Sequence, residues 1–166
     1  MSTSPKQQFL ETYDREHATT MGVLHAFPES KLDLCPHEKC RSARDLAWVF
    51  VMERGLAELV LEDRFPEGMG GEMPEPPESW ADLFRALEEA SSGYRALVAG
   101  MPDEEMGGTV SFLTGPNTVG KIPLKDFLWM MLYDEIHHRG QFSIYLRMAD
   151  GKVPSIYGPS ADEPWH

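Results

Sequence analysis

The chain has 166 residues, enough for one compact domain with a hydrophobic core and too few for two ordinary domains. Hydrophobic residues make up 42% and charged residues 25%, which excludes fibrous, collagenous and disordered proteins. Lys and Arg number 15 against 27 Asp and Glu, and the formal net charge of -12 argues against binding to nucleic acid or to an anionic membrane surface, since both partners require clustered cations. We therefore expect a single domain over residues 1–166.

The chain carries no sequence signal for secretion or membrane insertion. Its N-terminal segment lacks the apolar stretch of a signal peptide, and no apolar run approaches the roughly 18 residues of a membrane span. Cys35 and Cys40 are the only cysteines, so a secreted disulfide scaffold is not indicated. These features predict a cytoplasmic protein.

The first predicted helix covers residues 5–26, where apolar side chains recur at steps of three and four. This stripe consists of Leu10, Tyr13, His17, Met21 and Leu24. Pro28 ends the helix because the residue before a proline is disfavoured in the α conformation. Residues 28–41 are expected to form a connector.

The second predicted helix begins after Ser42, which forms a capping-box pattern with Asp45, and ends near Glu62. It is apolar nearly all round for its first two turns and is therefore expected to be the most buried helix. Residues 63–78 contain four prolines and three glycines, which predicts a mobile loop.

The third predicted helix is capped by Ser79 and ends at Gly100. The glycine-rich segment 101–121 is expected to contain at most a short β-like run over 109–113. A fourth helix is expected over 124–149, followed by an irregular C-terminal tail. Four helices of about 20 residues with long connectors predict an all-α four-helix bundle.

A candidate metal site follows from residue spacing on the fourth helix. Asp134 and His138 are one turn apart, so their side chains can bind a single ion together. Further ligands would come from facing helices, and His17 and Glu53 are the candidates predicted to point inward. Such oxygen and imidazole ligands suit a divalent metal such as Zn, Ni, Mn or Fe. An ionised Glu53 in the core would be costly without a cation or a strong donor.

The same residues also permit a purely structural interpretation. Asp134 and His138 can bond to each other or pair with Arg139 or Arg54, and Glu53 can pair with Arg54. A lone histidine such as His17 is more often a core or boundary residue than a ligand.

A second cluster of potential ligands lies in the first connector. Cys35, His37 and Cys40 bring two thiols and an imidazole together within six residues, and both ligand types bind zinc. The chain contains no second half for such a site, so the preferred interpretation is a connector with two incidental thiols.

Three segments resemble the DinB-like superfamily of four-helix bundles, which includes YfiT-like metal-dependent hydrolases and bacterial thiol-dependent transferases. They are DEIHHRGQFSIYLR at 134–147, SARDLAW at 42–48 and GKVPSIYGPSADEP at 151–164. The family's metal ligands are generally one His of the second helix and a His-x3-His pair of the fourth. In this chain the pair falls on Asp134 and His138, and the second-helix His falls at about Val49.

The resemblance therefore implies an altered metal site in which Glu53 or His17 replaces the missing second-helix ligand. Gln141 and Tyr145 are expected to hydrogen-bond the ligands from outside. A glycine inside a helix costs up to about 1 kcal/mol relative to alanine, so Gly140 predicts the close approach of another helix or of the C-terminal tail.

The resemblance implies a metal-dependent hydrolase or thiol-dependent transferase that acts on a small-molecule substrate, with the metal lowering the pKa of a bound water or thiol. One alternative is a non-catalytic homodimeric bundle with a degenerate metal site. Ten methionines and four tryptophans leave room for an exposed apolar patch and favour a homodimer. Another alternative is a small-molecule binding module with a pocket around Trp129 and Tyr145.

Overall fold

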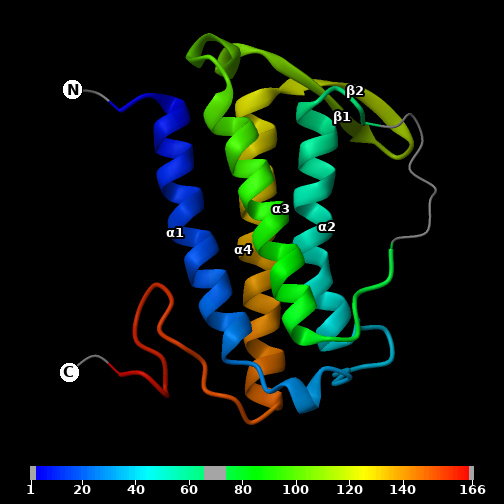
Figure 1. The fold of residues 1–166 in the computed structure, drawn as a ribbon, viewed down its shortest axis with the longest axis vertical. Coiled ribbons are helices and arrows are strands. Elements are labelled where there is room, and N and C mark those ends of the chain that lie inside the picture. Colours follow the sequence, from blue (N-terminus) through cyan, green and yellow to red (C-terminus); the bar gives the residue numbers. More distant parts are fainter. Residues whose placement is uncertain (1–2, 66–73, 165–166) are drawn as a thin grey trace.

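The computed structural model describes residues 3–65 and 74–164, and within them it contains four long helices and one β-hairpin (Figure 1). The helices are α1 (Pro5–His25), α2 (Ala43–Leu61), α3 (Trp80–Gly100) and α4 (Leu124–Met148). The antiparallel strands are β1 (Thr109–Gly115) and β2 (Thr118–Pro123). The predicted helical bundle is confirmed, and the helix limits lie within about two residues of the expected ones.

The starts of three helices are fixed by serine caps. Side chains of Ser4, Ser42 and Ser79 each accept a hydrogen bond from a backbone N–H in the first turn of α1, α2 and α3. Ser42 also donates to the carboxylate of Asp45, so the second bond of the predicted capping pattern joins the two side chains in place of the Ser42 backbone N–H. Half of the predicted mobile loop over 63–78 consists of residues 66–73, which lie outside the described residues.

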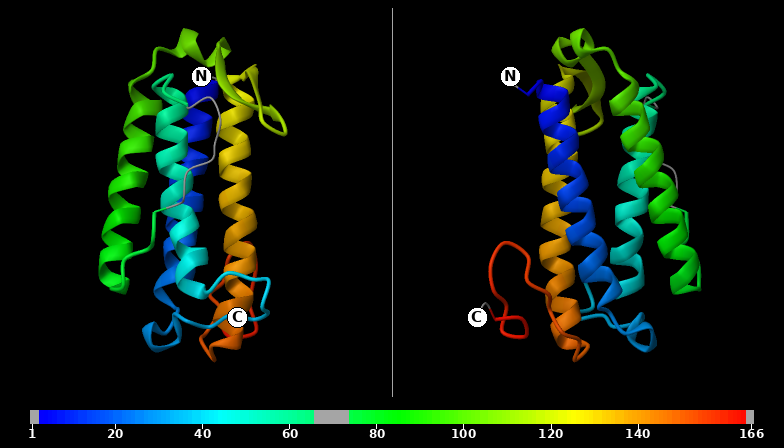
Figure 2. Two further views of the ribbon diagram at one scale, coloured as in Figure 1. Left: turned by 90° about the vertical axis from the view of Figure 1, so that its right-hand side faces the viewer. Right: turned by 60° about the vertical axis from the view of Figure 1, so that its left-hand side comes forward.

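Helices α1 and α4 run in one direction and α2 and α3 in the other (Figure 1). α1 packs against α4, and α2 packs against α3. The hairpin covers the end of the bundle where α4 begins, and the C-terminal tail lies beside the opposite end (Figure 2). None of the helices in the described ranges is both long and apolar enough to cross a membrane.

The hairpin is the main element that the sequence patterns underestimate. The expected β-like run over 109–113 is part of β1, but β2 was expected to be irregular. Asn117 closes the turn with a φ of 54°, a left-handed conformation that asparagine tolerates. Phe112 packs against Phe65 and Phe127, so the hairpin closes one end of the hydrophobic core.

The buried face of α1 is turned from the predicted one. Leu10, His17 and Met21 are only half-buried. The buried side chains are instead Phe9, Tyr13, Glu16, Thr20, Val23 and Leu24. Glu16 and Thr20 were not among the residues predicted to point inward, and both have hydrogen-bond partners inside the bundle.

A polar layer divides the hydrophobic core into two clusters. On every helix the apolar positions of one cluster are separated from those of the other by buried polar residues. These are Glu16 and Thr20 on α1, Glu53 and Arg54 on α2, Ser91 on α3, and Glu135 and Arg139 on α4. Buried charges require partners, so the buried ion pairs and charged hydrogen bonds of the bundle lie in this layer.

Candidate functional site

Helices α2 and α4 bring Glu53, Asp134 and His138 together at the edge of the polar layer. One ligand atom of each lies within 4.8 Å of those of the other two. Nδ1 of His138 is 2.7 Å from Oε1 of Glu53 and 3.9 Å from Oδ1 of Asp134. The side chain of Glu53 is 8% exposed, whereas that of Asp134 is 50% exposed. The cluster is therefore buried on the α2 side and open to solvent beside Asp134.

The buried atoms of this cluster are not satisfied by hydrogen bonds. Oε1 of Glu53 and Nδ1 of His138 form a close pair at 2.7 Å, but its geometry is not that of a well-aligned hydrogen bond, and neither atom has another partner among the described residues. Two converging lone pairs at this distance are the arrangement that a shared cation satisfies.

The ionisation of the pair agrees with a site that needs a cation. Burial raises the pKa of the Glu53 carboxyl, and this effect outweighs the opposing influence of His138 and Arg54. The pKa of His138 is also raised, chiefly by its contact with the Glu53 carboxylate.

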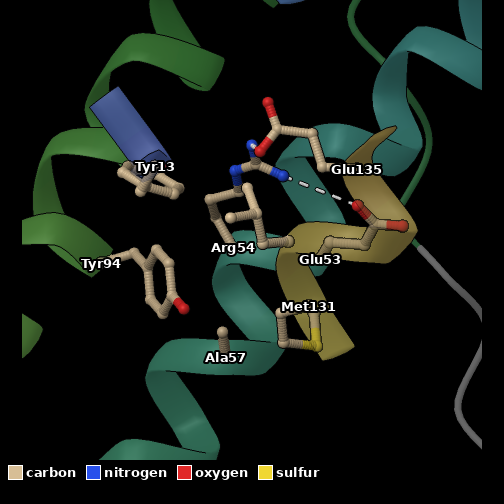
Figure 3. A pocket seen from close by; sticks show the side chains of 8 residues that line it. Tyr13, Glu53, Arg54, Ala57, Tyr94, Met131 and Glu135 are labelled. Carbon is tan, nitrogen blue, oxygen red and sulfur yellow. Dashed lines mark ion pairs between the residues drawn. The ribbon is translucent and has the colours of Figure 1, made fainter. Parts of the chain in front are cut away.

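Arg54 is the guanidinium nearest to this cluster. It is buried among Tyr13, Tyr94 and Glu135 around a cavity of about 10 Å³ (Figure 3). Nη2 of Arg54 lies 2.6 Å from Oε2 of Glu135, and Nη1 lies 3.5 Å from Oε2 of Glu53. The expected pairing of Glu53 with Arg54 is therefore present, but the shorter contact of Arg54 is to Glu135.

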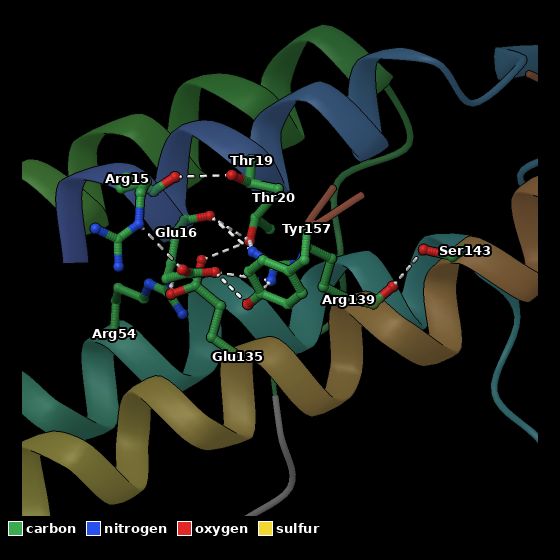
Figure 4. Close-up of polar contacts among 9 residues, drawn as sticks. All are labelled: Arg15, Glu16, Thr19, Thr20, Arg54, Glu135, Arg139, Ser143 and Tyr157. Atoms are coloured by element: carbon green, nitrogen blue, oxygen red, sulfur yellow. Dashed lines mark hydrogen bonds and ion pairs between the residues drawn. The ribbon is translucent and has the colours of Figure 1, made fainter. Parts of the chain in front are cut away.

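A hydrogen-bonded network continues from Glu135 to the C-terminal tail (Figure 4). Oγ1 of Thr20 lies 2.7 Å from Oε1 of Glu135 and 3.0 Å from the backbone oxygen of Glu16. Arg139 donates to the carboxylate of Glu16 at 2.8 Å. Arg139 therefore forms its ion pair with Glu16 of α1, and it does not pair with Asp134 or His138.

Three of the four predicted ligands meet, and His17 lies outside the cluster. His17 stacks on Tyr13 with ring centroids 6.0 Å apart, and burial, followed by the charge of Arg54, lowers its pKa. Val49, at the family's second-helix position, is buried one turn before Glu53 and offers no ligand atom. Glu53 therefore supplies the ligand from α2.

Gln141 and Tyr145, which were expected to hydrogen-bond the metal ligands, have other partners. Nε2 of Gln141 lies 2.9 Å from Nε2 of His137, and the hydroxyl of Tyr145 donates to the backbone oxygen of Arg41 at 3.0 Å. Trp129 packs edge-on against Phe9. Since 16 residues of helix span about 24 Å, Trp129 and Tyr145 do not share one pocket.

The cysteine-containing connector shows no metal geometry. Within the ranges that the structure describes, the only group of three or more potential ligands is Glu53, Asp134 and His138. Cys35 and Cys40 are exposed free thiols, and Sγ of Cys35 contacts the backbone oxygens of His37 and Cys40. This arrangement agrees with incidental thiols in a connector.

The sequence analysis missed the buried charges that support the cluster. Glu135 and Arg139 are spaced one turn apart and lie in phase with the apolar residues Leu132 and Phe142 of α4. That phase is the signal that could have identified them, because charged residues inside an apolar stripe are buried with it.

Comparisons with known proteins agree with this architecture. The model of the DinB family matches residues 1–165. The protein YrdA of Bacillus subtilis (strain 168), described as uncharacterized, is 23% identical over 156 residues, which cover 93% of this chain and 89% of YrdA.

Two solved structures share the fold. A DinB-like protein from Bacillus cereus ATCC 10987 superposes with a TM-score of 0.76 at 19% identity, covering 95% of this chain and all of the other. The DinB-like protein YjoA from Bacillus subtilis superposes with a TM-score of 0.68 at 19% identity, covering 89% of this chain and 96% of the other.

Proposed function

The chain belongs to the DinB family, and from this premise we propose that Glu53, Asp134 and His138 bind one divalent metal ion. The observation that carries the proposal is the buried pair of Glu53 and His138, whose ligand atoms converge at 2.7 Å without a well-aligned hydrogen bond. Asp134 lies on the solvent side of this pair, so a metal bound to all three residues would keep coordination positions free for water or substrate.

The local charge also supports a divalent cation. Glu53, Asp134 and Glu135 carry three negative charges, and Arg54 is the one Arg or Lys in the described ranges that forms ion pairs with them. Two negative charges remain, which a divalent ion bound to neutral His138 balances. Two carboxylates and an imidazole suit Mn or Fe and also accommodate Zn or Ni.

We propose that this centre serves a hydrolase or thiol-transferase reaction on a small molecule. A bound divalent metal lowers the pKa of water or of a thiol and so supplies a nucleophile near neutral pH. Glu53 and His138 hold their ligand atoms on rigid helices, and the ion pair of Arg54 with Glu135 fixes the charge behind Glu53. Asp134 faces the side from which substrate enters.

Metal binding is tested with protein purified without a histidine tag, stripped with chelator and titrated calorimetrically with Mn²⁺ and with Zn²⁺. His138→Ala removes a proposed ligand. His137→Ala is the matched control, because His137 is an exposed neighbour that contacts Gln141. We expect one ion per chain in the unchanged protein and in His137→Ala, and at least a tenfold loss of affinity in His138→Ala.

Two results would overturn the metal proposal. One is the absence of stoichiometric metal after supplementation of the unchanged protein. The other is equal affinity of His138→Ala and His137→Ala. Measuring metal content by mass spectrometry beside calorimetry shows whether metal acquired during expression blocks the titration.

We further propose a homodimer as the second candidate role, favoured by one exposed face of α4. Four of the five exposed large hydrophobic side chains in the described part of the chain are Met130, Tyr133, Ile144 and Met148 of this helix. Gly140 lies on the same face, and a Cβ there would meet no atom within 4 Å, so the close approach predicted for it is not made within one chain. A second copy would bury this face.

Sedimentation velocity of the unchanged protein and of Met130→Glu tests the homodimer, because Met130 is exposed on α4 and does not line the open groove on the other half of that helix. A dimer that becomes a monomer in Met130→Glu supports association through α4. A monomer at all concentrations, or a dimer that the variant leaves intact, contradicts it.

A further inference from the structure

An open groove of about 640 Å³ lies on α4 next to the proposed metal centre, at the junction with the connector before α2. Its apolar lining includes Leu46 and Ile144, and its polar lining includes Lys39, Arg41 and Tyr145. This volume is in the range of small-molecule sites. None of the lining residues is acidic, although the whole chain carries a net charge of -12.

Arg41 differs from every other arginine of the chain. Within residues 3–65 and 74–164, which contain all nine arginines, it is the only one that forms no ion pair with a carboxylate. Lys39, two residues away, forms none there either. The hydroxyl of Tyr145 donates to the backbone oxygen of Arg41 and ties this residue to α4. The groove therefore presents two cations whose charges are not neutralised by the described residues.

The groove and the metal centre are neighbours along α4. Gln141, which lines the groove, follows His138 by three residues, a rise of about 4.5 Å along α4. A molecule in the groove can thus place one end beside the cations and its other end beside Asp134 and His138.

The N-terminus of α2 does not supply this positive character. Its backbone N–H groups at Ala43, Arg44 and Asp45 already donate to the backbone oxygens of Leu34 and Leu32 and to the Ser42 hydroxyl. The side chains of Lys39 and Arg41 remain as the donors that a ligand can use. A guanidinium binds a carboxylate through two parallel hydrogen bonds, which suits Arg41 to an organic acid.

We infer that this groove binds a small organic carboxylate with an apolar body, held by Arg41 and Lys39 beside Leu46 and Ile144. The inference rests on the proposed function in naming the class of molecule presented to the metal centre. As a binding site, however, the groove is built from residues that are not metal ligands, so it can be tested without metal.

The test uses metal-free, chelator-treated full-length protein and two probes of nearly equal shape, phenylacetate and neutral phenylacetamide. Binding is followed by two-dimensional NMR of the backbone amides. We expect saturable shifts at residues 39–41 and 141–145 with phenylacetate, and at least tenfold weaker binding of phenylacetamide. Arg41→Gln should weaken phenylacetate binding about tenfold or more, as expected for loss of a charged hydrogen-bond donor.

Lys125→Gln is the matched control, because it removes one exposed positive charge at the opposite end of α4 and should leave binding unchanged. The NMR spectra report the folding of each variant. Equal binding of both probes, no saturable binding of phenylacetate, or equal effects of Arg41→Gln and Lys125→Gln would each overturn the inference. Because metal is absent throughout, such a failure is distinct from a failure of the metal proposal, which the calorimetric titration decides.

Discussion

The hydroxyl of Tyr157 donates a hydrogen bond of 2.6 Å to Oε2 of Glu16, and this bond joins the irregular C-terminal tail to the buried centre of α1. The same oxygen accepts from Arg139 at 2.8 Å. The Arg139 guanidinium lies 5.2 Å from the centroid of the Tyr157 ring. The tail therefore covers a buried ion pair between α1 and α4.

Replacing Tyr157 with Phe should lower the free energy of unfolding by about 1.5–3 kcal/mol, the usual value of a hydrogen bond to a charged group. The change removes only the hydroxyl, which donates to Glu16 and accepts from Arg139, and it keeps the ring beside the Arg139 guanidinium. Urea unfolding followed by circular dichroism measures the effect. Tyr133→Phe is the control, because Tyr133 is 62% exposed and its hydroxyl makes no hydrogen bond to the described residues. Equal unfolding midpoints for the two variants would contradict the role given to Tyr157.

The ionisation of Glu16 predicts a loss of stability in acid. Burial alone would raise its pKa, but hydrogen bonds from Tyr157 and Arg139 outweigh burial and hold the pKa below the ordinary value of 4.5. A carboxyl with a lowered folded-state pKa stabilises the fold above pH 4.5, and this contribution disappears as the pH falls through the folded-state value. The difference in unfolding free energy between the unchanged protein and Glu16→Gln should therefore shrink between pH 6 and pH 3. A difference that stays constant over this range would refute the assignment.

Apolar periodicity and capping residues were sufficient to predict the helices. Ser42 and Ser79 cap α2 and α3 as expected, because a helix start depends on local hydrogen bonds. Pairing of β1 with β2 depends on contacts between strands, and the glycine-rich composition of 101–121 concealed it.

The site was predictable only in part for a related reason. Asp134 and His138 are linked by helical spacing, and Glu53 stood out as a carboxylate in an apolar helix. The partnership of Glu135 with Arg54 joins two helices, and no spacing within one helix encodes it. His17 seemed equivalent to Glu53 because a one-residue error in the buried face of α1 turns a side chain by about 100°.

The phenol of Tyr94 gives a test of the small cavity in the polar layer. Tyr94 is buried, burial raises its pKa far above the usual range, and its hydroxyl has no hydrogen-bond partner in the part of the chain that the structure describes. Tyr94→Phe should therefore leave the free energy of unfolding unchanged or raise it by about 1 kcal/mol. Tyr13→Phe, in the same cavity, removes a hydrogen bond to the backbone oxygen of Ser91 and should lower it by about 0.5–1.5 kcal/mol. Thermal and urea unfolding would contradict this contrast if Tyr94→Phe were the more destabilised variant.

Glu135 should influence metal binding at the proposed centre without touching the metal. Its Oε2 atom holds Nη2 of Arg54 at 2.6 Å, whereas Glu53 lies 3.5 Å from the same guanidinium. In Glu135→Gln the Arg54 guanidinium loses its nearer carboxylate partner. Its remaining partner is the Glu53 carboxylate, for which it competes with a bound metal cation. Residues behind metal ligands typically change affinity about 10- to 100-fold, so we expect at least a tenfold weaker affinity for Mn²⁺ in calorimetric titration.

The matched control for Glu135→Gln is Glu58→Gln, which removes a carboxylate from α2 outside the candidate metal cluster. Circular dichroism at the titration temperature shows whether both variants keep the helical fold. If Glu135→Gln binds Mn²⁺ as tightly as Glu58→Gln, Arg54 does not compete for Glu53. Tighter binding in Glu135→Gln would mean instead that the Arg54 side chain moves away when it loses Glu135. The carboxylate of Glu53 would then be free for the metal.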